Sequence, residues 1–279
     1  MIKDSETNIV YFSKLIENYY PKEINKITDI LEKHGFEYGF LTGTNDIWCR
    51  DYMPVQKDVN SFVQFKFDPS YLKKYPEYLS YPKEVCSLNN FTPEFCDDIN
   101  LDGGNVIKWD NKVIVTERIF KENNKYDQSQ LIKDLEKILE VQVIIIPDIT
   151  KDETGHADGH VRFYDNNTIL VNKLDQEYLY WQDGFRKMIK KYGFKIIEVP
   201  WFTHYDKKHG RTAIGCYMNF LEIGNLIILP IFEVKGNKDQ EVFDLFASIY
   251  PNKIIETINI NSIGKHGGLM NCITWNILK

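Results

Sequence analysis

Two histidines and an aspartate alternate within residues 155–160, as His156, Asp158 and His160. Side chains two residues apart share one face of an extended strand, so these three are expected to point into one pocket. Flanking glycines permit close approach of the backbone to a ligand. An imidazole beside a carboxylate is typical of general acid–base catalysis. Three such groups on one face are also typical of zinc ligands, and the pattern leaves both chemistries open.

Cys272 is the candidate nucleophile. Gly267 and Gly268 precede it closely, as where a backbone passes close to a ligand. A nucleophilic cysteine requires a base, and His156 is the histidine with the most suitable neighbours. The alternative is that Cys272 is simply a small buried apolar residue.

Three aspartates stand in glycine-containing or turn-like segments, namely Asp51, Asp102 and Asp158. Turn formation is the alternative role for each of them. Carboxylates gathered beside a Cys–His pair are costly to bury unless the ligand is a cation. A planar cation with a fork of N–H donors matches two carboxylates, so these residues predict a guanidinium ligand.

The composition favours a cytoplasmic globular protein made of a single domain over residues 1–279. The chain has 43% hydrophobic residues and a net charge of -6, which argues against nucleic acid as a partner and suits a cationic ligand. No apolar run has the length of a signal peptide or a membrane span. The five cysteines are odd in number and scattered, as in a reduced compartment, and no C-x-x-C pair indicates zinc.

Helical and strand-like patterns alternate along the chain. Helices are predicted near residues 9–20, 24–34, 128–140, 176–192 and 240–250. Strands are predicted near residues 36–41, 63–67, 106–109, 113–116, 141–146, 161–164, 168–171, 195–199, 217–222, 226–229 and 253–257. Residues 68–100 are aromatic and contain prolines, and the prediction is least defined there.

A unit of hairpin, helix, strand and polar motif recurs along the chain. Asp51, Asp102 and Asp158 are spaced by 51 and 56 residues, and Cys272 follows after 114, close to two further units. The missing polar residue would fall near position 215, just after Arg211. Five such units around an axis would bring every polar motif to one end of a central cavity.

Four motifs, in this order, resemble those of the guanidine-modifying enzymes, most nearly the agmatine deiminase and bacterial peptidylarginine deiminase group. They are Trp48 to Asp51, Asp102 to Gly104, His156 to Asp158 with Arg162 and Phe163, and Gly267 to Cys272 with Thr274. The resemblance spans nearly the whole chain. It implies an α/β fold, the five-bladed pseudo-symmetric α/β propeller called the pentein fold, which agrees with the repeat.

The resemblance also implies a mechanism that needs no metal and no organic cofactor. Cys272 attacks the guanidinium carbon, and His156 protonates the departing ammonia and then activates water. Asp51 and Asp158 hold the guanidinium nitrogens, and Asp102 orients the histidine. The thiouronium adduct is then hydrolysed to a ureido product.

Four further residues are candidates for the substrate pocket. Gly268 is expected to pass close to the substrate. Trp48, and with it Trp201, is a candidate to stack on a cationic chain, with core packing as the alternative. The family pattern gives His160 no role, and we expect it in the pocket wall.

The chain departs from the agmatine deiminases at two places. Tyr52 and Met53 follow Asp51 where those enzymes commonly have Thr-Gly, and Asn271 precedes Cys272 where they commonly have His. A small guanidine such as agmatine is the first candidate substrate, and peptidyl-arginine is the second. Free arginine would need a cation for its carboxylate, for which the candidates are Lys207, Lys208 and Arg211.

The sequence is also compatible with other functions and assembly states. Amidino transfer would use the same residues with an amine in place of water. A metallohydrolase would use His156, Asp158 and His160 as ligands, and a non-catalytic binding module of the same fold is a third alternative. The sequence leaves the oligomeric state open, a homo-oligomer included.

Overall fold

Five three-stranded sheets of the same construction form the body of the molecule. The computed structural model describes residues 1–279. In each sheet the first two strands are antiparallel, and a third lies parallel to the middle one. The sheets are β3 (Val55–Asp58), β4 (Ser61–Lys66), β5 (Glu94–Asn100); β6 (Ile107–Trp109), β7 (Lys112–Thr116), β8 (Gln142–Ile146); β9 (Val161–Phe163), β10 (Thr168–Asn172), β11 (Lys195–Val199); β14 (Leu221–Ile223), β15 (Leu226–Ile231), β16 (Ile254–Asn259); and β17 (Trp275–Ile277), β1 (Ile9–Ser13), β2 (Glu37–Leu41).

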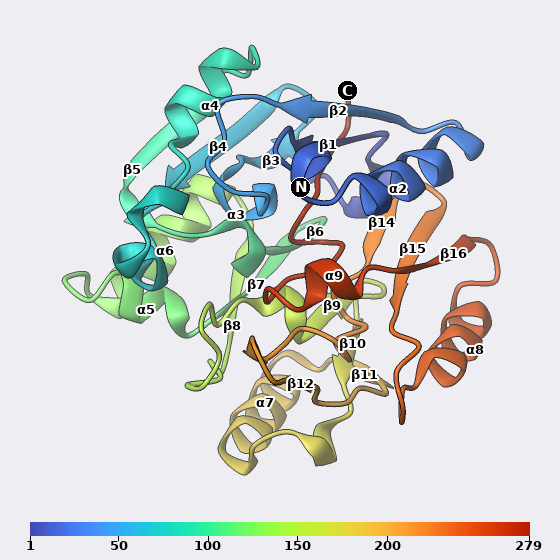
Figure 1. Cartoon of the computed structure of the whole chain (residues 1–279). Coiled ribbons are helices and arrows are strands. Elements are labelled where there is room, and N and C mark those ends of the chain that lie inside the picture. Colours follow the sequence, from blue (N-terminus) through green and yellow to red (C-terminus); the bar gives the residue numbers. More distant parts are fainter.

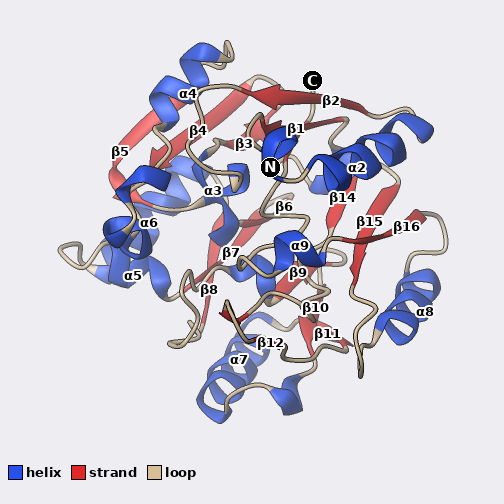
Figure 2. Ribbon diagram, viewed as in Figure 1, coloured by secondary structure: helices blue, strands red, loops and turns tan.

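A helix links the second strand to the third in every unit, because a parallel pair needs a crossover connection. These helices are α4 (Pro82–Leu88), α6 (Gln128–Leu139), α7 (Leu179–Tyr192), α8 (Asp239–Ile249) and α2 (Pro21–Lys33). They lie around the outside of the ring of sheets (Figures 1 and 2). In α6, Leu131, Leu135 and Leu139 recur at helical spacing and are buried, so the sequence period decides which face packs on the sheet.

The remaining elements are short. The helices are α1 (Ile16–Tyr19), α3 (Cys49–Tyr52), α5 (Arg118–Glu122) and α9 (Asn261–Gly264). The 3-10 turns are η1 (Asp4–Glu6), η2 (Ser70–Lys74), η3 (Pro76–Tyr78), η4 (Gly103–Asn105), η5 (Ala157–Gly159) and η6 (Leu174–Gln176). The pair β12 (Tyr205–Asp206) and β13 (Gly210–Arg211) forms a separate two-stranded sheet. None of the helices combines the length and the hydrophobicity that a membrane-spanning helix requires.

The two ends of the chain close the ring. Ile9 pairs with Ile277 across the antiparallel β1–β17 ladder and with Glu37 across the parallel β1–β2 ladder. The N-terminus continues past this sheet to the turn between β6 and β7, where its amino group donates to the carbonyl of Asp110. The predicted helix over 9–20 is therefore wrong for its first half. Residues 9–12 are β-branched and aromatic, which favours a strand, and only a partner from the far end of the chain completes the sheet.

The other predicted elements are confirmed with shifted ends. The strand predicted over 217–222 begins only at Leu221, and helix α7 begins at Leu179, after the separate turn η6. Residues 68–100 form η2, η3, α4 and β5. The predicted five-unit α/β architecture is thus present.

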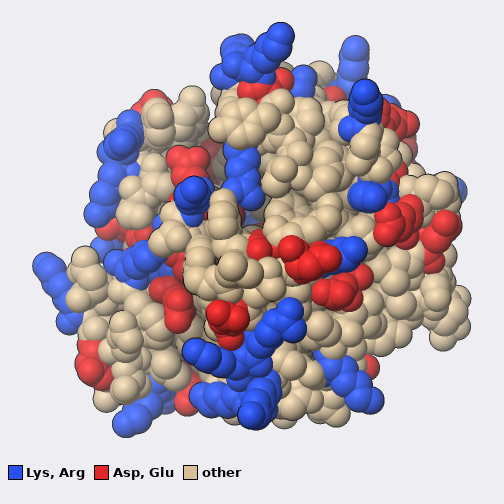
Figure 3. Space-filling model, turned by 90° about the horizontal axis from the view of Figure 1, so that it is seen from below, with Lys and Arg blue, Asp and Glu red and all other residues tan.

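Both signs of charge are interspersed over the face seen in Figure 3. The interior is also charged near the N-terminal turn η1. There the Asp4 side chain, which is 16% exposed, pairs with Arg162 at 2.8 Å and with Lys108 at 3.4 Å. A buried ion pair is costly unless its hydrogen bonds are satisfied, and this one is connected to the site described next.

Candidate active site

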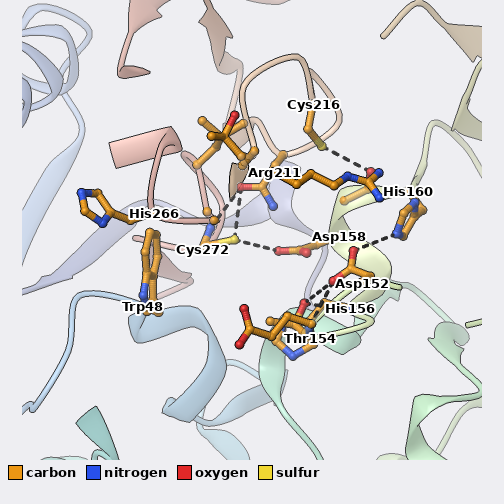
Figure 4. Close-up of a pocket in the computed structure, with 18 of the residues that line it drawn as sticks. Trp48, Asp152, Thr154, His156, Asp158, His160, Arg211, Cys216, His266 and Cys272 are labelled. Atoms are coloured by element: carbon orange, nitrogen blue, oxygen red, sulfur yellow. Dashed lines mark hydrogen bonds and ion pairs between the residues drawn. The ribbon is translucent and has the colours of Figure 1, made fainter. Parts of the chain in front are cut away.

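Each of the five units contributes one polar residue just before its first strand. They are Asp51 before β3, Asp102 before β6, Asp158 before β9, Asn219 before β14 and Cys272 before β17. All except Asp102 line one cavity of about 430 Å³, and Asp102 bonds to His156, which also lines it. Asn219 is thus the residue that the repeat predicted near position 215. The fold brings together residues that are far apart in sequence (Figure 4).

The Cys272 thiol lies between a carboxylate and an amide. Its Sγ is 3.6 Å from Asp158 Oδ2 and 3.4 Å from Asn219 Oδ1. The same Asn219 oxygen accepts the backbone N–H groups of Asn271 at 3.0 Å and Cys272 at 3.3 Å, which fixes the loop that carries the thiol. Burial raises the pKa of Cys272 well above its usual value, and the charges of Asp158 and Asp51 raise it further. These effects favour the protonated thiol until a cationic ligand binds beside it.

The His156 ring is held between two carboxylates. Its Nε2 is 2.8 Å from Asp102 Oδ2 and its Nδ1 is 3.4 Å from Asp51 Oδ1. Tyr71 donates its hydroxyl to the same Asp102 oxygen at 3.0 Å. Burial lowers the pKa of His156, but Asp51, Asp102 and Asp158 outweigh burial and raise it to about 10. His156 is accordingly an imidazolium at neutral pH.

Asp51 has an unsatisfied oxygen. Its side chain is buried, and its Oδ1 has no hydrogen-bond partner. Burial raises the pKa of Asp51 well above its usual value, and the neighbouring charges of Asp102 and Asp158 add to this, while His156 opposes it. This oxygen makes no hydrogen bond and has only the His156 ring nitrogen, 3.4 Å away, as a charged neighbour. Because Asp51 also lines the cavity, its carboxylate is suited to a cationic ligand.

Two glycines are required by close packing in the site. A Cβ on Gly104 would lie 2.6 Å from His156 Nδ1 and 2.4 Å from Asp51 Oδ1. A Cβ on Gly268 would lie 2.4 Å from the Trp48 ring. Gly268 and Trp48 both line the cavity, as expected for substrate contacts. What requires a glycine at 268 is the indole of Trp48.

His160 does not join His156 and Asp158. Residues 157–159 form the turn η5, and the His160 N–H donates to Ala157 O at 2.9 Å, so the expected extended strand is wrong. The two glycines and the short Asp favour a turn here. The His160 ring instead lies 3.7 Å from Asp152 and 3.9 Å from Glu177. It does line the cavity, as the sequence predicted.

The ligand set of the metallohydrolase alternative is not assembled. His156 faces Asp102 and Asp51, whereas His160 faces Asp152 and Glu177. No three or more His, Cys, Asp or Glu side chains are arranged to hold a metal ion. The geometry of the donors therefore gives this alternative no support.

Sequence reasoning missed three polar contributors to the site. Tyr71 comes from the segment with the least defined pattern and carried no signal. Asn219 had a signal in the repeat spacing, but no motif. Asn271 was noticed only as a departure from the family, yet it donates to Asp158 Oδ2 at 2.7 Å.

Aromatic and basic residues complete the cavity wall. Trp201, Arg211 and His266 line it, whereas Lys207 and Lys208 do not. Figure 4 shows Trp48 and His266 on the Cys272 side of the cavity and His160 on the other. Arg211 is thus the one cation, of the three candidates for a substrate carboxylate, that reaches the site.

The comparisons with known proteins agree with this geometry. The family model described as Porphyromonas-type peptidyl-arginine deiminase matches residues 9–277, nearly the whole chain. The chain belongs to this family. Among curated proteins, it is 28% identical over 236 residues to the "Putative agmatine deiminase" of Mycoplasma capricolum subsp. capricolum. That alignment covers 69% of this chain and 61% of the Mycoplasma protein, so it spans less than two thirds of that relative.

Two solved structures show the same fold across the whole chain. A Cys-to-Ser variant of the agmatine deiminase of C. jejuni, with its substrate bound, superposes with a TM-score of 0.79 at 19% identity. The match covers 100% of this chain and 96% of that one. The agmatine deiminase of Enterococcus faecalis gives a TM-score of 0.80 at 17% identity, over 100% and 95% of the two chains. These likenesses establish the pentein fold of this family member.

Proposed function

We propose that the protein hydrolyses a small guanidinium compound to a ureido product and ammonia. The observation that carries the proposal is the convergence of a thiol, an imidazolium and two buried carboxylates in one cavity. Asp51 and Asp158 supply the negative charge that a guanidinium needs, and Cys272 lies 3.6 Å from one of them. Membership of the deiminase family supports the same reaction.

In the proposed mechanism the substrate activates the nucleophile. The thiol of Cys272 has a raised pKa because it is buried beside Asp158 and Asp51. A guanidinium bound by these carboxylates places positive charge next to the sulfur and lowers that pKa. The thiol gives its proton to solvent, and the resulting thiolate adds to the guanidinium carbon.

His156 acts as the acid and then as the base. As an imidazolium it gives its proton to the departing nitrogen, and ammonia leaves while the thiouronium forms. The neutral imidazole takes a proton from water, which adds to the same carbon, and the C–S bond breaks to release the ureido product. Asp102 keeps the ring oriented through its 2.8 Å bond, and Tyr71 holds Asp102 in turn.

Agmatine is the preferred substrate. Besides Asp51 and Asp158, the cavity is lined by the acids Asp46, Asp152, Glu153 and Glu177. These acids outnumber the lining cations Lys151, Arg211, His156 and His160, and a wall that is acidic on balance favours a molecule with a second positive charge. The curated relative and both solved relatives carry the name agmatine deiminase. Free arginine is the alternative, because Arg211 lines the cavity and would meet its carboxylate.

The test measures ammonia and ureido product from agmatine, free arginine and a blocked arginine peptide. Turnover of agmatine above the other two is expected, and Cys272→Ala should abolish it. Cys96→Ala, which removes a half-buried thiol outside the cavity, is the matched control. Turnover that persists in Cys272→Ala would overturn the proposal.

The variant Arg211→Gln distinguishes agmatine from free arginine as the substrate. If agmatine is the substrate, this change leaves its KM nearly unchanged. If arginine is the substrate, loss of the cation should raise the KM for arginine about tenfold while agmatine remains poor.

A further inference from the structure

Asn271 connects a buried cation to the carboxylate beside the nucleophile. Its Oδ1 accepts from Arg162 at 2.9 Å, and its Nδ2 donates to Asp158 Oδ2 at 2.7 Å. All three side chains are buried. The same Asp158 oxygen is the one that faces Cys272 Sγ.

The orientation of the Asn271 amide follows from its neighbours. A guanidinium can only donate hydrogen bonds, so the oxygen of the amide must face Arg162. The NH₂ group must then face Asp158, where it meets an acceptor. An apolar residue at 271 makes neither bond, and removing the amide leaves a buried carboxylate oxygen without its donor.

Arg162 is itself held by three further contacts, and only its Nε has no hydrogen-bond partner. Its guanidinium donates to Asp4 at 2.8 Å and to the carbonyl of Phe220, and it lies 4.8 Å from the centre of the Phe220 ring. The backbone of Asn271 is held as well, since its N–H donates to Asn219 and its carbonyl accepts from Arg50. The amide therefore has little freedom to turn.

The neutral Asn271 side chain keeps Arg162 from pairing directly with Asp158. Direct contact would let the guanidinium of Arg162 form a charge-assisted pair with Asp158 and occupy the oxygens that a substrate needs. Through Asn271, the arginine orients the carboxylate without pairing with it. We infer that Asn271 is a positioning residue that holds Asp158, through Arg162, in the orientation that receives the substrate cation.

This inference rests on the proposed function, in which Asp158 binds the guanidinium. The side-chain hydrogen bonds of Asn271 go to Arg162 and Asp158 and not to Cys272 Sγ, so its effect is expected on cation binding. Loss of the amide should raise KM more than it lowers kcat. The same loss should weaken the preference of Cys272 for cationic electrophiles.

The experiment compares alkylation of Cys272 by chloroacetamidine, a cation, with alkylation by neutral chloroacetamide. The ratio of the two rates reports the carboxylates whether or not the right substrate is known. Asn271→Ala and Arg162→Met should each lower the ratio about tenfold, and the double variant should fall no further than either alone. Asn271→His, the residue common in the related enzymes, can both donate and accept and should restore most of the ratio.

Three reference variants make the outcome decisive. Asp158→Asn should collapse the ratio. Asn123→Ala removes another buried, hydrogen-bonded asparagine outside the cavity and should leave the ratio unchanged. If Asn271→Ala unfolds, Asn271→Leu keeps the side-chain volume and gives the same reading.

Two results would overturn the inference, and they are distinguishable. An unchanged ratio in Asn271→Ala, with a collapsed ratio in Asp158→Asn, refutes the positioning role and leaves the proposed function intact. A wild-type protein with no preference for the cation, and no effect of Asp158→Asn, refutes the carboxylate site itself and the proposed function with it.

Discussion

His156 and His160 flank the turn η5, and both rings are buried among carboxylates. In both, burial lowers the pKa but neighbouring acids raise it, to about 10 for His156 and about 9 for His160. The difference is geometric. His156 makes a 2.8 Å bond to Asp102, whereas His160 lies 3.7 and 3.9 Å from its acids and neither ring nitrogen has a hydrogen-bond partner.

The two histidines therefore differ in how firmly the ring is oriented, although both are expected to be charged. A short bond from a carboxylate that is itself held by Tyr71 fixes the direction of the His156 ring, which a proton donor requires. His160 neutralises Asp152 and Glu177 without a fixed direction, and its ring packs 5.9 Å from the buried Trp181 ring. We expect catalysis to depend on the first histidine and stability on the second.

Replacing each histidine by glutamine is the strongest test of the comparison. His156→Gln should lower kcat about 10³-fold or more, because the general acid is lost. His160→Gln should stay within about tenfold of wild type, because it alters only the charge of the wall. Steady-state rates on the substrate that the protein turns over give both values, and equal losses would remove the distinction.

Asp102→Asn tests whether the 2.8 Å bond is what sets His156 apart. An amide keeps the shape but not the charge, so the imidazolium is less favoured and kcat should fall about 10²-fold. Glu177→Gln is the equivalent change beside His160 and should have little effect on kcat. A larger loss in Glu177→Gln would reverse the assignment.

For stability, the change at His160 should matter more than the change at His156. His160→Leu leaves Glu177 buried without its positive neighbour and should lower the free energy of unfolding by about 3 kcal/mol. Adding Glu177→Gln should recover part of that loss. Urea unfolding monitored by circular dichroism measures both, and a loss under about 1 kcal/mol would show that His160 carries no charge in the folded protein.

Activity should follow the titration of His156 with pH, and stability should follow that of His160. The pKa of His156 is raised to about 10, so kcat/KM should decline as pH rises through about 10 and the proton is lost. The folded pKa of His160 is raised from 6.5 to about 9, so its contribution to stability is full below about pH 6.5 and is lost as pH rises through about 9. If the alkaline decline of kcat/KM moved to another pH in His160→Gln, the titrating group would be His160 and not His156.

The amino-acid sequence alone determined the repeat, the order of the four motifs and the family they resemble. These depend on local patterns, namely hydrophobic period, turn residues and short polar motifs, and each unit makes its own sheet from such a pattern. The spacing of Asp51, Asp102 and Asp158 even placed a missing residue near 215, four positions from Asn219.

Only the tertiary structure decided how the side chains meet. The strand β1 is completed by β17 from the other end of the chain. Because that partner cannot be seen in the local sequence, the residues of β1 were also compatible with a helix. Residues 156–160 alternate as a strand would, but they turn in η5 and send His160 to a different set of acids. Asn271 and Tyr71 gain their roles from Arg162, Asp158 and Asp102, whose contacts with them span from 31 to 113 residues of sequence. Such contacts have no local period, and so no pattern along the chain could reveal them.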